Sequence, residues 1–90
     1  KVSIFRANKY ILVMIDKPPE LKELGKAIRA VRESKGFSQD KFAYEIGVGR
    51  SYYGSLERGE INVSALTLIK ISRGLNVEVF DIFPSILDRN

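Results

Sequence analysis

The segment of residues 38–59 constrains the fold more than any other part of the chain. Three apolar residues near its start are spaced as one face of a short helix: Phe42, Ala43 and Ile46. Ser38 is a typical N-terminal cap for that helix. Gly47 can adopt the left-handed conformation that stops a helix within one residue, and Val48 anchors the turn that follows. The pattern predicts a short helix, a tight turn and a second helix.

The second helix, expected over about residues 49–57, combines an inward apolar stripe with a polar outer face. Tyr53 and Leu56 are spaced to point inward, and the small Ala43 allows the two helices to cross closely. The side chains left on the outer face are those of Arg50, Ser51, Tyr52 and Ser55. An exposed helix with Arg and hydroxyl groups near its N-terminus suits the major groove of double-stranded DNA. We therefore expect these four residues to contact bases.

At these residues the chain resembles the lambda-repressor/Cro-like (XRE-type) family of bacterial and phage DNA-binding regulators. The family pattern is a Gln that opens the first helix, a small residue four positions on, a Gly-apolar turn and a closing Glu-x-Gly. The matching residues are Gln39, Ala43, Gly47-Val48 and Glu57-Arg58-Gly59. The similarity extends over residues 20–84, and the stretch RSYYGSLERGEINVS resembles the restriction-modification controller proteins in particular.

The pattern and the resemblance together predict an all-α, five-helix lambda-repressor-like domain over residues 19–84. The first helix is expected over 19–35, and the fourth over 64–74, with Ser64 as its cap. The core stripe of that fourth helix would be Ala65, Leu68, Ile71 and Leu75. The fifth helix would run from Val77 to Pro84, followed by a C-terminal tail at 85–90.

Residues 1–18 form an extended or β-structured arm in this prediction, because VSIF and YILVMI are β-rich runs. Two interpretations stay open. The arm is either a non-essential extension that precedes a natural start at Met14, or a strand that pairs two copies of the chain.

Composition excludes several function classes. With 90 residues and 44% hydrophobic content, the chain fits one globular domain. Because it contains neither Cys nor His, the usual zinc sites and His-based catalysis cannot be assembled. We therefore expect no enzymatic activity, no metal and no cofactor. The net charge of +4 mildly favours an anionic partner. No apolar run approaches the roughly 18 residues that span a membrane, so we expect a cytoplasmic, nucleoid-associated protein of a bacterium or phage.

The resemblance also implies contacts to the DNA backbone. Gln39 would grip a phosphate at the start of its helix, aided by Ser38, with Lys41 as a weaker candidate. Arg58 and the backbone N–H groups from Asn62 to Ser64 would hold the opposite side of the half-site. Arg32 and Glu57 match a pair that links the first helix to the end of the reading helix.

Gly54 departs from a good helix sequence, since Gly costs roughly 1 kcal/mol relative to Ala inside a helix. It either lets the backbone approach the DNA groove or is a tolerated defect.

Apolar residues outside the inward stripes suggest a surface for a second copy of the chain. The residues expected at this two-fold interface are Leu66, Ile69, Phe80, Phe83 and Ile86. The alternative is that the N-terminal arm or the tail folds over them.

The sequence thus predicts a homodimeric transcriptional regulator that binds a palindromic operator and needs no small-molecule effector. The alternative is a protein-interaction module, coactivator-like or an antitoxin, that reuses the same fold.

Overall fold

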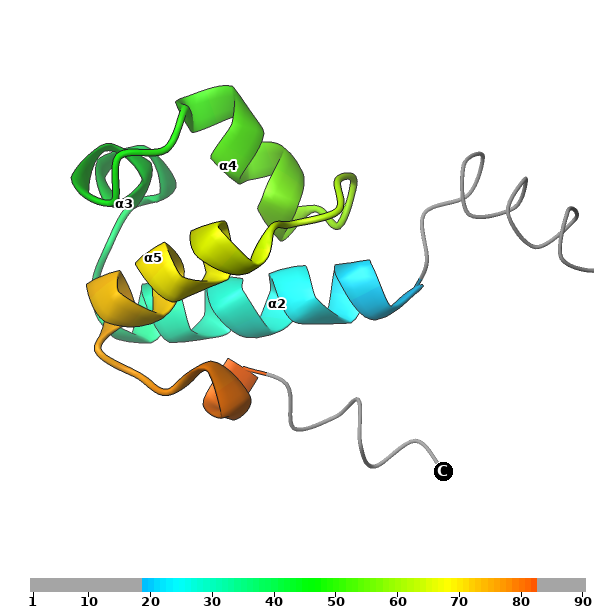
Figure 1. Cartoon of the computed structure of the whole chain (residues 1–90). Coiled ribbons are helices and arrows are strands. Elements are labelled where there is room, and N and C mark those ends of the chain that lie inside the picture. Colours follow the sequence, from blue (N-terminus) through cyan, green and yellow to red (C-terminus); the bar gives the residue numbers. More distant parts are fainter. Residues whose placement is uncertain (1–18, 83–90) are drawn as a thin grey trace, which may run out of the picture.

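The computed structural model describes residues 19–82, which contain four α-helices and one short 3₁₀ helix (Figure 1). The elements are α2 (Pro19–Ser34), α3 (Gln39–Glu45), α4 (Arg50–Glu57), α5 (Ala65–Leu75) and η1 (Val79–Ile82). No strand occurs in this part of the chain, so the predicted all-α class is confirmed for it. The predicted arm at 1–18 and the tail at 85–90 lie outside the described residues.

The predicted five-helix arrangement is wrong in its last element. Where a helix from Val77 to Pro84 was expected, the chain forms only the single turn η1 within the described residues. The Asp81 carboxylate accepts a hydrogen bond from the Glu78 backbone N–H at 3.2 Å, which closes this turn locally. The β-branched Val77 and Val79 add little helix propensity to such a short segment.

The predicted signals at the helix ends are confirmed for Ser38, Gly47 and Ser64. The Ser38 side chain accepts a hydrogen bond from the Lys41 backbone N–H at 3.2 Å, and Ser64 caps α5 in the same way. Gly47, with φ of +74°, lies in the turn after α3, and Asn76, with φ of +59°, ends α5. Both residue types tolerate this left-handed conformation, so the turns need no tertiary support.

The core lies where α2, α3, α4 and α5 meet. Its buried hydrophobic residues are Leu24, Ile28, Phe42, Ala43, Tyr53, Leu56, Ile71, Leu75 and Ile82. The rings of Phe42 and Tyr53 pack edge to face with centroids 5.5 Å apart, which joins the two helices of the motif. Ala65, predicted in the core stripe of its helix, is exposed.

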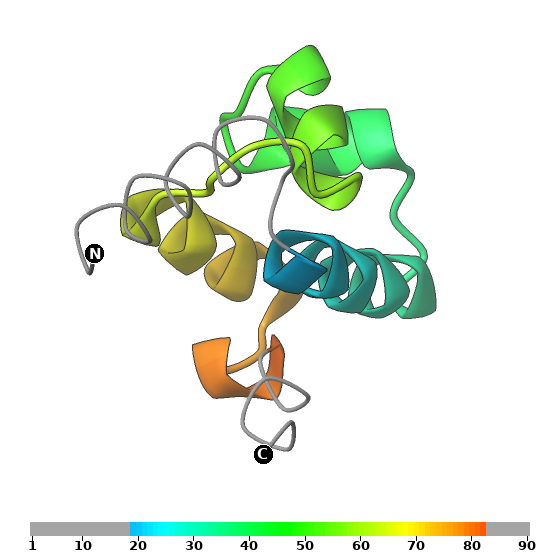
Figure 2. The ribbon, with the colours of Figure 1, turned by 90° about the vertical axis from the view of Figure 1, so that its right-hand side faces the viewer.

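The elements are stacked in a simple order. In two perpendicular views, α3 and α4 lie on one side of α2 and α5, and η1 lies on the other side (Figures 1 and 2).

Gly25 allows α4 to rest directly on α2. A Cβ atom on Gly25 would lie 2.8 Å from the carbonyl oxygen of Leu56 and 2.7 Å from the carbonyl carbon of Glu57. Only a residue without a side chain fits between the backbones at this crossing. The carboxyl end of α4 is therefore fixed against the middle of α2.

Candidate nucleic-acid interface

The outer face of α4 carries the residues predicted to read bases. Arg50, Ser51 and Tyr52 are exposed, whereas Ser55 is partly buried. The neighbouring tyrosines divide as predicted, because Tyr52 is 39% exposed and Tyr53 is fully buried. The N-terminal half of α4 thus presents a guanidinium group and hydroxyl groups away from the core.

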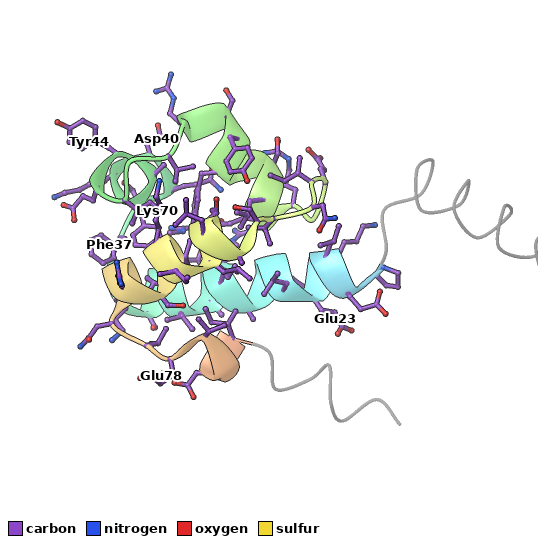
Figure 3. All side chains as sticks on the ribbon, viewed as in Figure 1. Glu23, Phe37, Asp40, Tyr44, Lys70 and Glu78 are labelled. Carbon is purple, nitrogen blue, oxygen red and sulfur yellow. The ribbon has the colours of Figure 1, made fainter. Side chains whose placement is uncertain are left out.

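Asp40 on α3 faces Arg50 at the start of α4. The distance from Arg50 Nη1 to Asp40 Oδ2 is 3.5 Å, and both side chains are more than 60% exposed. Figure 3 places Asp40 near the first turn of α4. This pair could not be predicted from the sequence, because no local pattern indicates which residues face each other across the turn.

Arg32 and Glu57 form a buried, bidentate ion pair, as the resemblance implied. Arg32 Nε donates to Glu57 Oε2 at 2.7 Å, and Arg32 Nη2 donates to Glu57 Oε1 at 3.1 Å. The remaining nitrogen, Arg32 Nη1, donates to the Phe37 carbonyl oxygen at 2.6 Å. The guanidinium group therefore connects α2, the end of α4 and the loop before α3.

The electrostatics of this pair favour the charged forms. Burial alone would raise the pKa of the Glu57 carboxyl, but hydrogen bonds to it, that from Arg32 foremost, leave the pKa below its ordinary value of 4.5. The hydrogen bond with Glu57 raises the pKa of Arg32. Burial, followed by the nearby Glu57 carboxylate, raises the pKa of the Tyr53 hydroxyl, which stays neutral. The site therefore holds one fixed positive and one fixed negative charge at neutral pH.

Gln39, predicted to grip a phosphate, also belongs to this network. Its amide nitrogen Nε2 donates a hydrogen bond to Glu57 Oε1 at 2.9 Å. Glu57 therefore orients the first residue of α3 as well as Arg32. Ser38, the second residue predicted on this side, uses its hydroxyl group to cap α3.

Arg58 follows α4 and folds back along it. Arg58 Nε donates to Glu60 Oε2 at 3.0 Å, and Arg58 Nη2 donates to Ser55 Oγ at 3.3 Å. The hydrogen bond from Arg58 lowers the pKa of the exposed Glu60 carboxyl. Gly54 is buried beneath Arg58 and Gln39. Arg58 thus lies on the same side of α4 as Gln39, although the two were predicted to hold opposite sides of a half-site.

The remaining predicted backbone contacts are at the surface. Lys41, Asn62 and Ser64 are exposed. The Ser64 hydroxyl group caps α5 and also donates to Thr67 Oγ1 at 3.0 Å. Because the hydroxyl group is used in this way, a phosphate contact here would come from the backbone N–H groups near Ser64.

Two apolar residues of α5 are exposed at the surface. Leu66 is 63% exposed and Ile69 is 41% exposed, which agrees with their predicted outward position. A shallow groove between α5 and η1 adjoins Ile69. The side chain of Phe80, together with Phe83 and Ile86, lies outside the described residues. Tyr44 on α3, 85% exposed, is a further apolar residue whose ring points away from the helices (Figure 3).

Within residues 19–82, no group of three or more carboxylates is placed to hold a metal ion. In the same range, no helix is long and apolar enough to cross a membrane.

Two short helices joined by a Gly turn, with a polar outer face on the second, define the helix-turn-helix class of DNA-binding proteins. Comparison with known families agrees, because the profile described as "Helix-turn-helix" matches residues 28–82. The chain belongs to this XRE-type helix-turn-helix family and is a DNA-binding transcriptional regulator, which is a non-enzymatic function.

Restriction-modification controller proteins are among its relatives. The control protein C.MunI of Mycoplasma sp is 40% identical over 63 residues, which are 69% of this chain and 85% of that protein. The structure of the controller protein C.AhdI from Aeromonas hydrophila has 36% identity and a TM-score of 0.71, covering 73% of this chain and 100% of that one. The controller protein C.Esp1396I has been solved as a tetramer in complex with its natural 35 base-pair operator. It has 26% identity and a TM-score of 0.69, covering 80% of this chain and 95% of that chain.

Proposed function

We propose that the chain binds a palindromic operator as a homodimer and reads the major groove with α4. The observation that carries this proposal is the exposed outer face of α4, on a helix that a buried ion pair holds against α2. A rigid helix can place its side chains against base edges with little loss of conformational freedom. In the operator complex of C.Esp1396I, a related chain of the same fold is bound to DNA.

In this proposal Arg50 reads a guanine, since a guanidinium group can bond to both O6 and N7. Ser51, Tyr52 and Ser55 make the remaining base contacts. The phosphate contacts come from Ser38, Gln39, Lys41, Arg58 and the backbone from Asn62 to Ser64. These assignments follow from the position of each residue around α4 and from the family pattern.

The homodimer would form through α5 and the segment that follows it. Leu66 and Ile69 are exposed apolar residues of α5, and Ile69 also lines the groove between α5 and η1. A two-fold axis there would present two copies of α4 to half-sites one helical turn, or about 34–36 Å, apart. No small-molecule effector enters this scheme, and the protein would act in the bacterial or phage-infected cytoplasm, where its DNA is.

A selection experiment tests the proposal. Genomic DNA fragments are bound to the purified protein at near-physiological salt, recovered and sequenced. Recovery of a palindromic sequence is the expected result. Recovery of no preferred sequence would contradict the proposal and favour the alternative, a protein-interaction module with the same fold.

A further inference from the structure

Two polar side chains lie close to the backbone of α4 at Gly54, because this residue has no side chain of its own. A Cβ atom at this position would lie 3.2 Å from Arg58 Nη1 and 3.4 Å from Gln39 Oε1. Gly54 is buried, so the sequence-based idea that its backbone itself approaches the DNA groove does not fit its position. The side chains of two different elements instead meet over it.

Arg58 reaches Gly54 because the two residues are four positions apart. Side chains at the end of a helix point back toward its N-terminus, which brings Arg58 over the preceding turn. Its hydrogen bonds to Glu60 and Ser55 hold the guanidinium group along α4. The third nitrogen, Nη1, lies over Gly54.

Gln39 approaches from α3 and is oriented by Glu57. An amide group has two N–H donors, and the bond from Nε2 to Glu57 uses one of them. The second N–H remains for a ligand. The amide oxygen Oε1 of Gln39 and Nη1 of Arg58 both lie over Gly54, so the amide and the guanidinium group are neighbours there, each held by a separate set of protein contacts.

We propose that Gly54 is a positioning residue that lets Arg58 and Gln39 act together on one phosphate of the DNA backbone. This inference rests on the proposed function and identifies one of its contacts to the backbone. Phosphate oxygens suit the pair, because the guanidinium group and the second N–H of the Gln39 amide can each donate a hydrogen bond to them. A Cβ atom at position 54 would be in tight contact with both groups, so the guanidinium group would have to shift by a few tenths of an ångström.

The substitution Gly54→Ala separates this role from a structural one. Ala is the better helix former, so the melting temperature should rise or stay unchanged. The phosphate pair should nevertheless be weakened, so that affinity for DNA falls about three- to tenfold for all sequences alike. If Gly54 has no role in DNA binding, Gly54→Ala should raise the stability in the same way and leave the affinity for DNA unchanged.

A double-mutant cycle with Arg58→Ala tests whether Gly54 acts through Arg58. The full chain and its variants are titrated with a random-sequence duplex of about 20 base pairs at several salt concentrations, and circular dichroism gives the melting temperatures. Arg58→Ala should reduce the slope of log K against log salt by about 1. In the Arg58→Ala background, Gly54→Ala should weaken binding no further. Ser34→Ala, an exposed helical position on α2, is the control for helix propensity and should leave affinity unchanged.

Each other outcome has a distinct meaning. If Gly54→Ala binds DNA as the wild type does, or weakens binding equally in both backgrounds, Gly54 is not a positioning residue for Arg58. An unfolded Gly54→Ala protein would also overturn the inference. The added methyl group would then disrupt the packing of the helices and would not simply displace the Arg58 side chain. Failure of the wild type to bind any duplex would instead refute the proposed function, and this inference with it.

Discussion

Asp40 on α3 faces Arg50 on α4 across the turn between the two helices, with 3.5 Å between Oδ2 and Nη1. A carboxylate from the other helix of the motif is thus placed to orient the side chain proposed to read a base. The same carboxylate repels the phosphates that Arg50 would approach. Orientation of Arg50 by Asp40 would favour specific binding, whereas repulsion between Asp40 and the phosphates would weaken all DNA binding. The two effects can therefore be told apart.

Asp40→Asn should bind DNA more tightly but discriminate less at the base pair that Arg50 reads. Removing one repulsion of about 0.6 kcal/mol, acting over roughly 7 Å of water, raises affinity about threefold at low salt. The stability should stay within about 0.5 kcal/mol of wild type, since an exposed pair contributes little. Titration of operator variants at two salt concentrations measures both effects. Glu45→Gln, an exposed carboxylate at the other end of α3, is the control, and equal specificity in both variants would refute an orienting role for Asp40.

Arg50→Ala should relax specificity at one base pair in each half-site. The loss of a bidentate contact to guanine costs about 1–3 kcal/mol of discrimination per contact. Footprinting on single-base operator variants measures it, with Lys41→Ala as the comparison for a non-reading cation of α3. A uniform loss of affinity for all sequences would make Arg50 a phosphate ligand and overturn the assignment.

Glu57→Ala should damage folding more than sequence preference. It removes the buried partner of the Arg32 guanidinium and leaves only the exposed Glu33 carboxylate, 3.9 Å from Arg32 Nη2. Breaking a buried pair in this way typically costs about 3–5 kcal/mol. Urea unfolding followed by circular dichroism measures the loss. Glu33→Ala removes an exposed carboxylate that pairs with Arg29 and lies 3.9 Å from Arg32 Nη2, and it should change the unfolding midpoint far less than Glu57→Ala does. A wild-type midpoint in Glu57→Ala, with DNA binding lost, would contradict the structural role.

Stability should also fall in acid because of Glu57. The folded-state pKa of Glu57 is below its unfolded value of 4.5, so the stabilisation is complete above about pH 4.5 and is lost as the pH falls through the folded-state pKa. Unfolding free energies measured between about pH 6 and about pH 3 should therefore decrease toward low pH. Glu57→Gln should lack this part of the decrease, whereas Glu33→Gln should retain it. If the unfolding free energies of wild type and Glu57→Gln decreased in parallel toward low pH, a lowered pKa of the Glu57 carboxyl would be contradicted.

Leu66→Lys with Ile69→Lys should give a folded monomer that binds DNA far more weakly. The lysines of one copy would face and repel those of the other copy across the proposed two-fold axis. A monomer alone makes too few contacts with DNA for tight binding. Analytical ultracentrifugation gives the oligomeric state, and circular dichroism confirms folding. Tyr44→Lys replaces an exposed apolar residue on α3 and should leave the protein dimeric. A double variant that stays dimeric would move the interface to the arm, with residues 10–15 pairing as strands.

The local features of the fold could be predicted because each depends on a few consecutive residues. Ser38 and Ser64 cap their helices and Gly47 lies in the turn as expected, since capping and left-handed turns need no distant partner. The last element could not be predicted so well, because the periodicity around Val77 fits a helix and a single turn alike. Ala65 is the first residue of α5 and is exposed, although the helical spacing places it in line with the buried Ile71 and Leu75.

The side-chain network of the site was only partly predictable. The pair of Arg32 and Glu57 is separated by 25 positions, and only the family resemblance indicated it. The contacts of Asp40 with Arg50 and of Gln39 with Glu57 depend on the angle at which α3 and α4 cross. That angle is set by packing in the core and leaves no signal in the spacing of polar residues.

If the chain pairs through α5 and the segment after it, as proposed, the stacking of α3 and α4 on one side of α2 and α5 has a consequence for how duplicated genes would diverge. Substitutions on the outer face of α4 can change the preferred half-site while the proposed pairing surface stays the same. Two duplicated copies would then acquire different operators before they lose the ability to pair with each other. During that period the cell would contain mixed dimers, which read asymmetric sites that neither copy recognises alone.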